Sequence, residues 1–184
     1  MNQPFCIRPF RPADQSAVEV LVLDIQRNEF GLALSASNQP DLESVGTFFS
    51  AAKSAFWVAE DLQSREIIGC IGLEALPEHR AVMRKFMVHP NWRGKAAGVA
   101  LALNDAFESH ARDEGVTQIV LSTVEPTKAA QRFYLRMGYE TIERSDLPKA
   151  FAPGVLDTIF FSKAATGRKR KSTAFTRQDR PSTG

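Results

Sequence analysis

The chain has 184 residues, of which 43% are hydrophobic and 24% charged, and its formal net charge is +2. This size and balance indicate one globular domain with a real core, and they exclude a fibrous or wholly disordered protein. No apolar run approaches the ~20 residues that cross a bilayer, and no signal peptide is visible.

The charge is unevenly distributed along the chain. Residues 166–184 hold six basic residues and one acidic residue, which leaves residues 1–165 with 17 basic and 20 acidic side chains and a net charge of −3. We therefore expect a domain over residues 1–164 and a basic, disordered tail over 165–184. The mildly acidic body argues against a nucleic-acid surface. Only two cysteines, Cys6 and Cys70, are present, which favours a reducing, cytoplasmic setting over a disulfide framework.

The first half of the chain predicts one strand, two helices and a hairpin. Residues 5–10 read as a strand, and Asp14 then caps a helix with an apolar face at Ala17, Val18, Leu21, Val22 and Ile25. The stretch 28–40 is irregular, and Asp41 caps a second helix that reaches about residue 53. Residues 56–60 and 67–73 form a β-hairpin.

The second half alternates strands with helices. A strand over 81–88 precedes a helix from Val99, whose C′ residue is Gly115. The apolar run 119–121 is typical of a buried strand. Thr127 begins a helix that ends at Gly138, and strands follow at 139–143 and 156–162. The layout is α/β (α+β), with a mixed sheet of about seven strands and about four helices.

One segment predicts an anion site. The strand ending in Phe86, Met87 and Val88 leads into a small-residue loop that opens a helix, an arrangement that presents backbone N–H groups and a positive helix end to a phosphate. The loop residues are Arg93, Gly94, Lys95, Ala96, Ala97, Gly98 and Val99. The side chains of Arg93 and Lys95 add positive charge.

This loop, together with Phe133-Tyr134 shortly before Gly138, resembles the coenzyme A site of the GCN5-related N-acetyltransferase (GNAT) family. The resemblance covers residues 7–162 and departs from the family pattern at Ala96, where relatives usually have glycine. It implies a mixed twisted sheet whose splayed central strands hold acetyl-CoA, with the backbone of residues 86–88 along the cofactor arm. Thr127 either contacts that arm or is a plain helix cap.

Acetyl transfer from a thioester to an amine needs a proton donor for the departing thiolate. Tyr134 matches the family's tyrosine, and its pKa of ~10 lies above the ~8.5 of a thiol. The base is left open. The strand before the loop has no glutamate, and Ser122 stands where other relatives place one. Glu74 and Glu125 remain as candidates acting through water, and bulk water is the third alternative.

Further segments of the chain resemble a bacterial subgroup of the family that has no assigned substrate. They are residues 29–31, 39–42, 56–60, 144–148 and 157–158. The family places its acceptor near Glu29, Phe30 and the Ser145–Gly154 loop, where a carboxylate and an aromatic ring suit an ammonium group. The three histidines lack metal-ligand spacing, so we expect no metal.

The leading interpretation is an N-acetyltransferase that moves an acetyl group from acetyl-CoA directly to a primary amine of a small molecule. We expect no nucleic-acid or membrane partner and allow for a homodimer. Two alternatives stay open: an acetyltransferase for lysine or N-terminal amines of proteins, and a non-catalytic acyl-CoA sensor.

Overall fold

The computed structural model describes residues 4–165 and contains one seven-stranded mixed sheet in the order β1-β2-β3-β4-β5-β7-β6. The strands are β1 (Phe5–Pro9), β2 (Ala55–Asp61), β3 (Ile67–Leu76), β4 (Arg80–Val88), β5 (Gln118–Thr123), β6 (Glu140–Ile142) and β7 (Ile159–Ala164). Neighbouring strands are antiparallel except β4 and β5, which are parallel. The predicted α+β fold with a mixed sheet is confirmed. The predicted basic tail lies outside the described residues from 166 onward.

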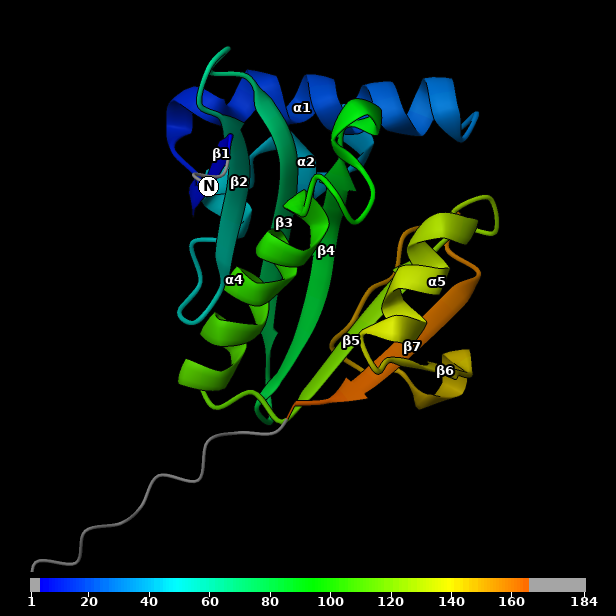
Figure 1. Ribbon diagram of the computed structural model, residues 1–184. Helices are drawn as coiled ribbons and strands as arrows, with labels where there is room; N and C mark the ends of the chain where they lie inside the picture. Colours follow the sequence, from blue (N-terminus) through cyan, green and yellow to red (C-terminus); the bar gives the residue numbers. More distant parts are fainter. Residues whose placement is uncertain (1–3, 166–184) are drawn as a thin grey trace, which may run out of the picture.

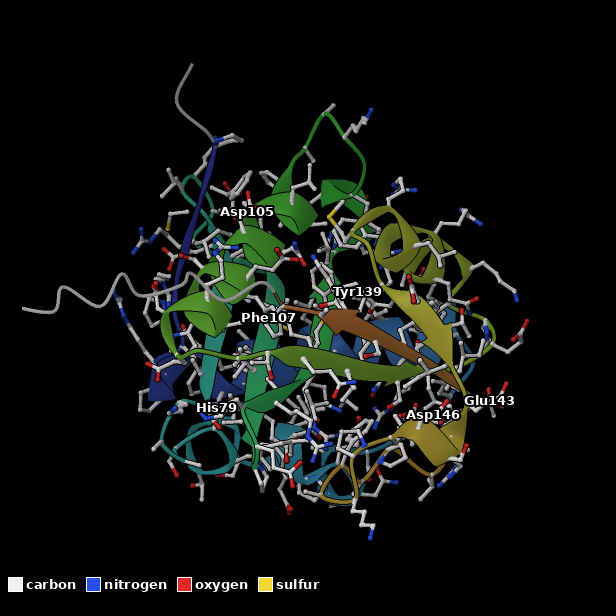
Figure 2. The ribbon with its side chains drawn as sticks, turned by 90° about the horizontal axis from the view of Figure 1, so that it is seen from below. His79, Asp105, Phe107, Tyr139, Glu143 and Asp146 are labelled. Atoms are coloured by element: carbon white, nitrogen blue, oxygen red, sulfur yellow. The ribbon has the colours of Figure 1, made fainter. Side chains whose placement is uncertain are left out.

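Helices cover both faces of the sheet (Figure 1). On one face lie α4 (Val99–Asp113) and α5 (Lys128–Arg136), and on the other lie α1 (Gln15–Asp24), α2 (Pro40–Glu43) and α3 (Val45–Phe48). The apolar residues of α4 recur every four positions, so Val99, Leu103 and Phe107 all face the sheet and are fully buried. Phe107 and Tyr139, labelled in Figure 2, belong to this larger core.

The region between α1 and β2 differs from the prediction. The expected helix from Asp41 to about residue 53 is two short helices with a break at Ser44, whose φ and ψ are −146° and 78°. The side chain of Gln15 fills the break, because its amide donates to the Leu42 carbonyl at 2.7 Å and accepts from the Val45 N–H at 3.1 Å. A side-chain amide thus replaces one turn of helical hydrogen bonding.

None of three predicted helix N-caps forms the side-chain hydrogen bond expected of it. Asp14 and Thr127 occupy the N-cap positions of α1 and α5 but make no capping side-chain bond, and the N-cap residue of α2 is Gln39 rather than Asp41. The Asp14 carboxylate instead pairs with Arg8. The carboxylate also accepts from the Arg11 N–H at 2.7 Å, so its oxygens are engaged before the helix begins, and the charged bidentate contact with Arg8 is the stronger of these bonds.

Two further element bounds were misjudged. Strand β7 begins at Ile159 rather than at residue 156, because residues 154–157 form a turn closed by a 3.0 Å bond from the Asp157 N–H to the Gly154 carbonyl. Helix α1 continues as a π-helical turn, Ile25–Glu29, and Ala17 on its expected apolar face is exposed. π-Turns are often found at functional sites.

Candidate active site

The sheet opens between its two central strands. β4 and β5 pair only over Arg80–Val82 and Gln118–Val120, although β4 continues to Val88 and β5 to Thr123. Figure 1 shows the two strands diverging beyond this point. Met87 and Val88 pair with β3 on one side, and residues 86–88 have no strand partner on the other. The open side of these residues, where the Val88 carbonyl already accepts from Arg93, provides the edge along which an extended, amide-bearing arm can lie.

A bulge in β4 sets the side-chain directions at this opening. The register with β3 shifts between Cys70 and Gly72, opposite Lys85, which has a φ of +48°. As a result Lys85 turns toward α2, while the Phe86 ring packs on the α5 side with its centroid 5.4 Å from that of Phe133. The bulge thus separates a polar face of β4 from an aromatic one.

The predicted phosphate loop lies at the end of β4. Gly94 and Gly98 have φ values of +91° and +72°, so both positive-φ positions of the loop are glycines, and a Cβ on either would meet nothing within 4 Å. The 15-residue helix α4 begins at Val99 without a side-chain cap. Its first N–H groups remain available for an anion, and Lys95, Ala96 and Ala97 lie in the turn before them.

The structure brings together two residues that the sequence assigned to different subsites. The Arg93 guanidinium donates to both carboxylate oxygens of Glu29 at 2.6 and 2.8 Å, and its Nε donates to the Val88 carbonyl at 2.7 Å. Glu29 therefore lies against the phosphate loop and is not a free carboxylate for an acceptor amine. Its assignment to the acceptor site stays a prediction. Phe30 is half-buried and packs on the α1 core.

Tyr134 lies on α5 beneath the opening and is only 6% exposed. Its ring centroid is 5.6 Å from that of Phe161 and 6.3 Å from that of Phe86. Burial, with a smaller contribution from the negative charge of Asp157, raises the pKa of this phenol well above its usual value of 10.0. The hydroxyl therefore stays protonated at neutral pH, as a proton donor must.

The hydroxyl of Thr127 is already engaged. It donates to the Val124 carbonyl at 2.7 Å and lies 2.8 Å from the Thr123 hydroxyl. A contact with the cofactor arm would have to use its remaining lone pair.

The two predicted base candidates are not brought to Tyr134. Glu74 lies on β3 opposite Val82 and pairs with the Nε of Arg84 at 2.7 Å. Glu125 is 65% exposed and pairs with Lys128. Each carboxylate thus has a cationic partner, and Glu125 is also largely exposed.

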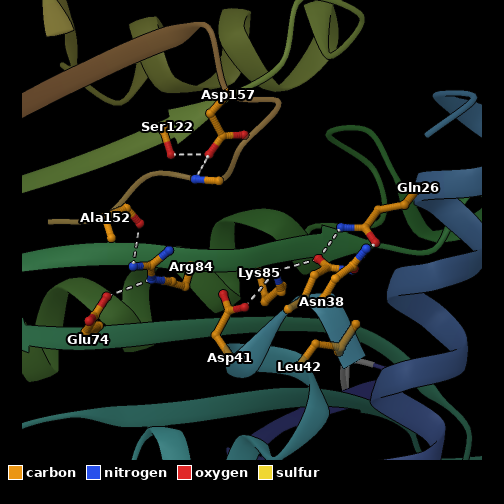
Figure 3. A network of polar contacts seen from close by, with 12 residues as sticks. Gln26, Asn38, Asp41, Leu42, Glu74, Arg84, Lys85, Ser122, Ala152 and Asp157 are labelled. Atoms are coloured by element: carbon orange, nitrogen blue, oxygen red, sulfur yellow. Dashed lines mark hydrogen bonds and ion pairs between the residues drawn. The ribbon is translucent and has the colours of Figure 1, made fainter. Parts of the chain in front are cut away.

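Sequence reasoning missed a polar face beside the opening, shown in Figure 3. The buried ammonium of Lys85 contacts Asp41 at 3.0 Å and the Gln39 amide oxygen at 2.8 Å, and Gln39 exchanges two hydrogen bonds with Gln26. On the other side, the Ser122 hydroxyl donates to Asp157 at 2.5 Å. Long gaps in sequence separate all these partners, and the polar spacing of β4 was the only available signal.

Arg84 ties this polar face to the loop between β6 and β7. Its guanidinium donates to the Ala152 carbonyl at 3.2 Å and lies over the rings of Phe151 and Phe48, 5.2 and 5.7 Å from their centroids. The loop is therefore held against β4.

The described part of the chain has neither a metal-binding cluster nor a membrane-spanning helix. Residues 4–165 contain no group of three His, Cys, Asp or Glu side chains placed to hold a metal ion. None of the helices within those residues combines the length and the apolar character needed to cross a bilayer.

Comparison with known proteins supports this geometry. Residues 52–141 match the family model described as an acetyltransferase (GNAT) domain. A probable N-acetyltransferase 14 of Xenopus tropicalis is 33% identical over 120 residues, which are 65% of this chain and 57% of that protein. N-acetyltransferase 8B of Rattus norvegicus is 30% identical over 97 residues, 51% of this chain and 43% of that protein. The chain thus spans about half the length of the curated relatives it matches.

Solved structures align over more of the chain. A GNAT-family acetyltransferase of Staphylococcus aureus superposes with a TM-score of 0.82 at 27% identity, covering 88% of this chain and 99% of that one. N-acetylglutamate synthase of Neisseria gonorrhoeae, solved with coenzyme A and N-acetylglutamate, superposes with a TM-score of 0.69 at 15% identity over 90% of this chain and 36% of that one. The fold of this chain is the GNAT fold, and residues 52–141 match the acetyltransferase (GNAT) domain.

Proposed function

We propose that this protein is an acyl-CoA N-acetyltransferase that transfers the acetyl group of acetyl-CoA directly to a primary amine of a small molecule. The observation that carries the proposal is the alignment of three features along one opening. These are the free edge of β4 at residues 86–88, the uncapped start of α4, and the buried phenol of Tyr134. The β4 edge suits the extended arm of acetyl-CoA, the start of α4 suits its pyrophosphate, and Tyr134 suits its leaving sulfur.

Each part of the site then has a chemical task. The N–H groups at the start of α4, with Arg93 and Lys95, bind the pyrophosphate. The free N–H groups of residues 86–88 hold the arm and stabilise the charge that develops on the thioester oxygen. Tyr134 donates its proton to the departing thiolate, which is favourable because the phenol keeps that proton until negative charge appears beside it.

A small acceptor is favoured over an extended peptide by the loop between β6 and β7. Arg84 and Phe151 hold this loop against β4, on the side from which the amine must approach. Kinship with a bacterial subgroup of the family is supported by the similarity to the Staphylococcus aureus structure and to an acetyltransferase of Streptococcus agalactiae, which has a TM-score of 0.82 at 25% identity.

The test has a binding arm and a turnover arm. At 100 times its Kd, acetyl-CoA should stabilise the fold by about 2.7 kcal/mol, which for this size raises Tm by roughly 5–10 °C. A panel of small amines and of lysine and N-terminal peptides is then incubated with acetyl-CoA and read by mass spectrometry. Acetylation of a small amine supports the proposal, and acetylation of peptides alone would assign a protein acetyltransferase. Binding without any turnover would leave an acyl-CoA sensor.

A further inference from the structure

An unpaired carboxylate lies at the mouth of the opening. The Oδ2 atom of Asp157 accepts hydrogen bonds from the Ser122 hydroxyl at 2.5 Å and from the Gly154 N–H at 2.8 Å. Within residues 4–165, Oδ1 accepts no hydrogen bond and no cationic side chain pairs with this carboxylate. The group is half-buried. It therefore has no cationic partner among the described residues and one oxygen free for a ligand.

The carboxylate lies close to the expected reaction centre. Ser122 lies on β5 beyond Val120, the last residue paired with β4. It shares a face of the sheet with Val120, which packs on Phe151, so Ser122 and Asp157 approach the opening from the side of the acceptor loop. Tyr134 approaches it from the α5 side, where its ring packs against Phe86 of β4 and Phe161 of β7.

Two anchors hold Asp157 in place. On the N-terminal side of Asp157, the Arg84 guanidinium donates to the Ala152 carbonyl and holds the loop. After Asp157, the Thr158 N–H donates to the Thr123 carbonyl at 3.0 Å and fixes the chain to the end of β5. The carboxylate is thereby positioned by the sheet itself, as a catalytic group requires.

The surrounding charges leave Asp157 as the group that attracts a cation. Arg84 from β4 is paired with Glu74 from β3, and Lys85 from β4 is paired with Asp41 from α2. Each of these pairs is neutral as a whole. Tyr134 from α5 is uncharged. An incoming ammonium therefore meets one uncompensated negative charge.

We propose that Asp157 is the general base of the reaction and that Ser122 positions it, an inference that rests on the proposed N-acetyltransferase function. Asp157 draws the ammonium form of the acceptor to the opening, and its free Oδ1 takes one proton from that ammonium. The neutral nitrogen then attacks the thioester carbon. As the N–C bond forms and the C–S bond breaks, the nitrogen releases its second proton to solvent. Tyr134 gives its proton to the sulfur. Asp157 then releases its proton and Tyr134 regains one from solvent, so the products are the N-acetyl amine and free coenzyme A.

The test compares Asp157→Asn with wild type, using the most active amine of the acceptor panel. Asparagine retains an oxygen that accepts from Ser122 and Gly154, so the loop is preserved while the base is removed. The matched control is Asp105→Asn, which removes an exposed carboxylate on α4, labelled in Figure 2 and outside the predicted acceptor loop. Thermal unfolding and the Kd of acetyl-CoA verify the fold of each variant, and kcat is measured from pH 6 to 10.

Asp157→Asn should lower kcat about 10²–10⁴-fold at pH 7, with the Kd of acetyl-CoA unchanged, and Asp105→Asn should behave like wild type. The kcat of Asp157→Asn should rise about tenfold per pH unit toward the pKa of the amine, whereas wild-type kcat should stay flat because Asp157 accepts the proton of the ammonium within the complex. Ser122→Ala should give a smaller loss with the wild-type profile. A wild-type profile in Asp157→Asn would overturn the role of Asp157 while the proposed function stands. Absence of wild-type turnover with every amine would remove the proposed function, and this inference with it.

Discussion

The ion pair between Glu29 and Arg93 predicts an effect on cofactor affinity. In the free protein both nitrogens at the end of the Arg93 side chain donate to Glu29, and the two side chains are 35% and 36% exposed. A pyrophosphate at the loop must share or displace this contact. Glu29→Gln should therefore tighten coenzyme A binding, because Arg93 is released and a negative charge beside the phosphates is removed.

The magnitude follows from the exposure of the pair. Exposed ion pairs contribute about 0.2–1 kcal/mol, and a bidentate pair belongs at the upper end. A release of about 1 kcal/mol lowers the Kd roughly fivefold. Since these charges lie at the surface, the gain should fall toward none as salt rises to 0.5 M, where the screening length is only a few ångströms.

Isothermal titration of coenzyme A into wild type, Glu29→Gln and Glu140→Gln measures this effect at low and high salt. Glu140 is an exposed glutamate on β6, so its variant controls for the change in net charge. An unchanged or weakened affinity in Glu29→Gln would refute the competition. A rise in the KM of the acceptor alone would return Glu29 to the acceptor site.

Three further outcomes follow from the buried residues. Tyr134→Phe should lower kcat about 10²–10⁴-fold and leave the Kd of acetyl-CoA within about twofold, and equal kcat would reassign Tyr134 to packing. Gly72→Ala should destabilise the fold by roughly 1–3 kcal/mol in urea unfolding, because its Cβ would lie 2.5–2.8 Å from two phenylalanine rings, whereas Gly46→Ala, whose nearest atom is at 3.6 Å, should change little. Both tyrosines of the chain have pKa values raised above 10.0 by burial, so they keep their protons when the unfolded chain loses them. Above pH ~10 the free energy of unfolding should thus fall by up to about 1.4 kcal/mol per pH unit for each tyrosine, and a Tyr134→Phe variant that falls as steeply as wild type would contradict this.

Local patterns predicted most of the fold. The four-residue spacing from Val99 to Ala111 predicted α4, and Gly115 with its φ of +73° ends that helix as expected. The apolar run 119–121 became a central buried strand. These features depend on residues within one or two turns of each other, and a single sequence displays them directly.

The errors occur where a distant side chain decides the structure. Gln15 is about thirty residues from the helix break that it fills. Glu29 and Arg93 are 64 residues apart, and Ser122 and Asp157 are 35 apart. Helix and strand periodicity carry no information on such pairs. The glycine-containing loop before α4 and the place of Tyr134 on α5 were therefore predictable from the sequence, whereas the environment of each candidate base was not.

The most direct test of the account follows a labelled acetyl group. Wild type and Tyr134→Phe are incubated with trideuterioacetyl-CoA and the small-amine panel, while free thiol and labelled amide are measured together. The account predicts one labelled N-acetyl amine for each coenzyme A released, at a rate at least about 10²-fold lower in Tyr134→Phe. Release of coenzyme A with labelled acetate as the only product, or no release from the bound acetyl-CoA with any amine, would contradict it.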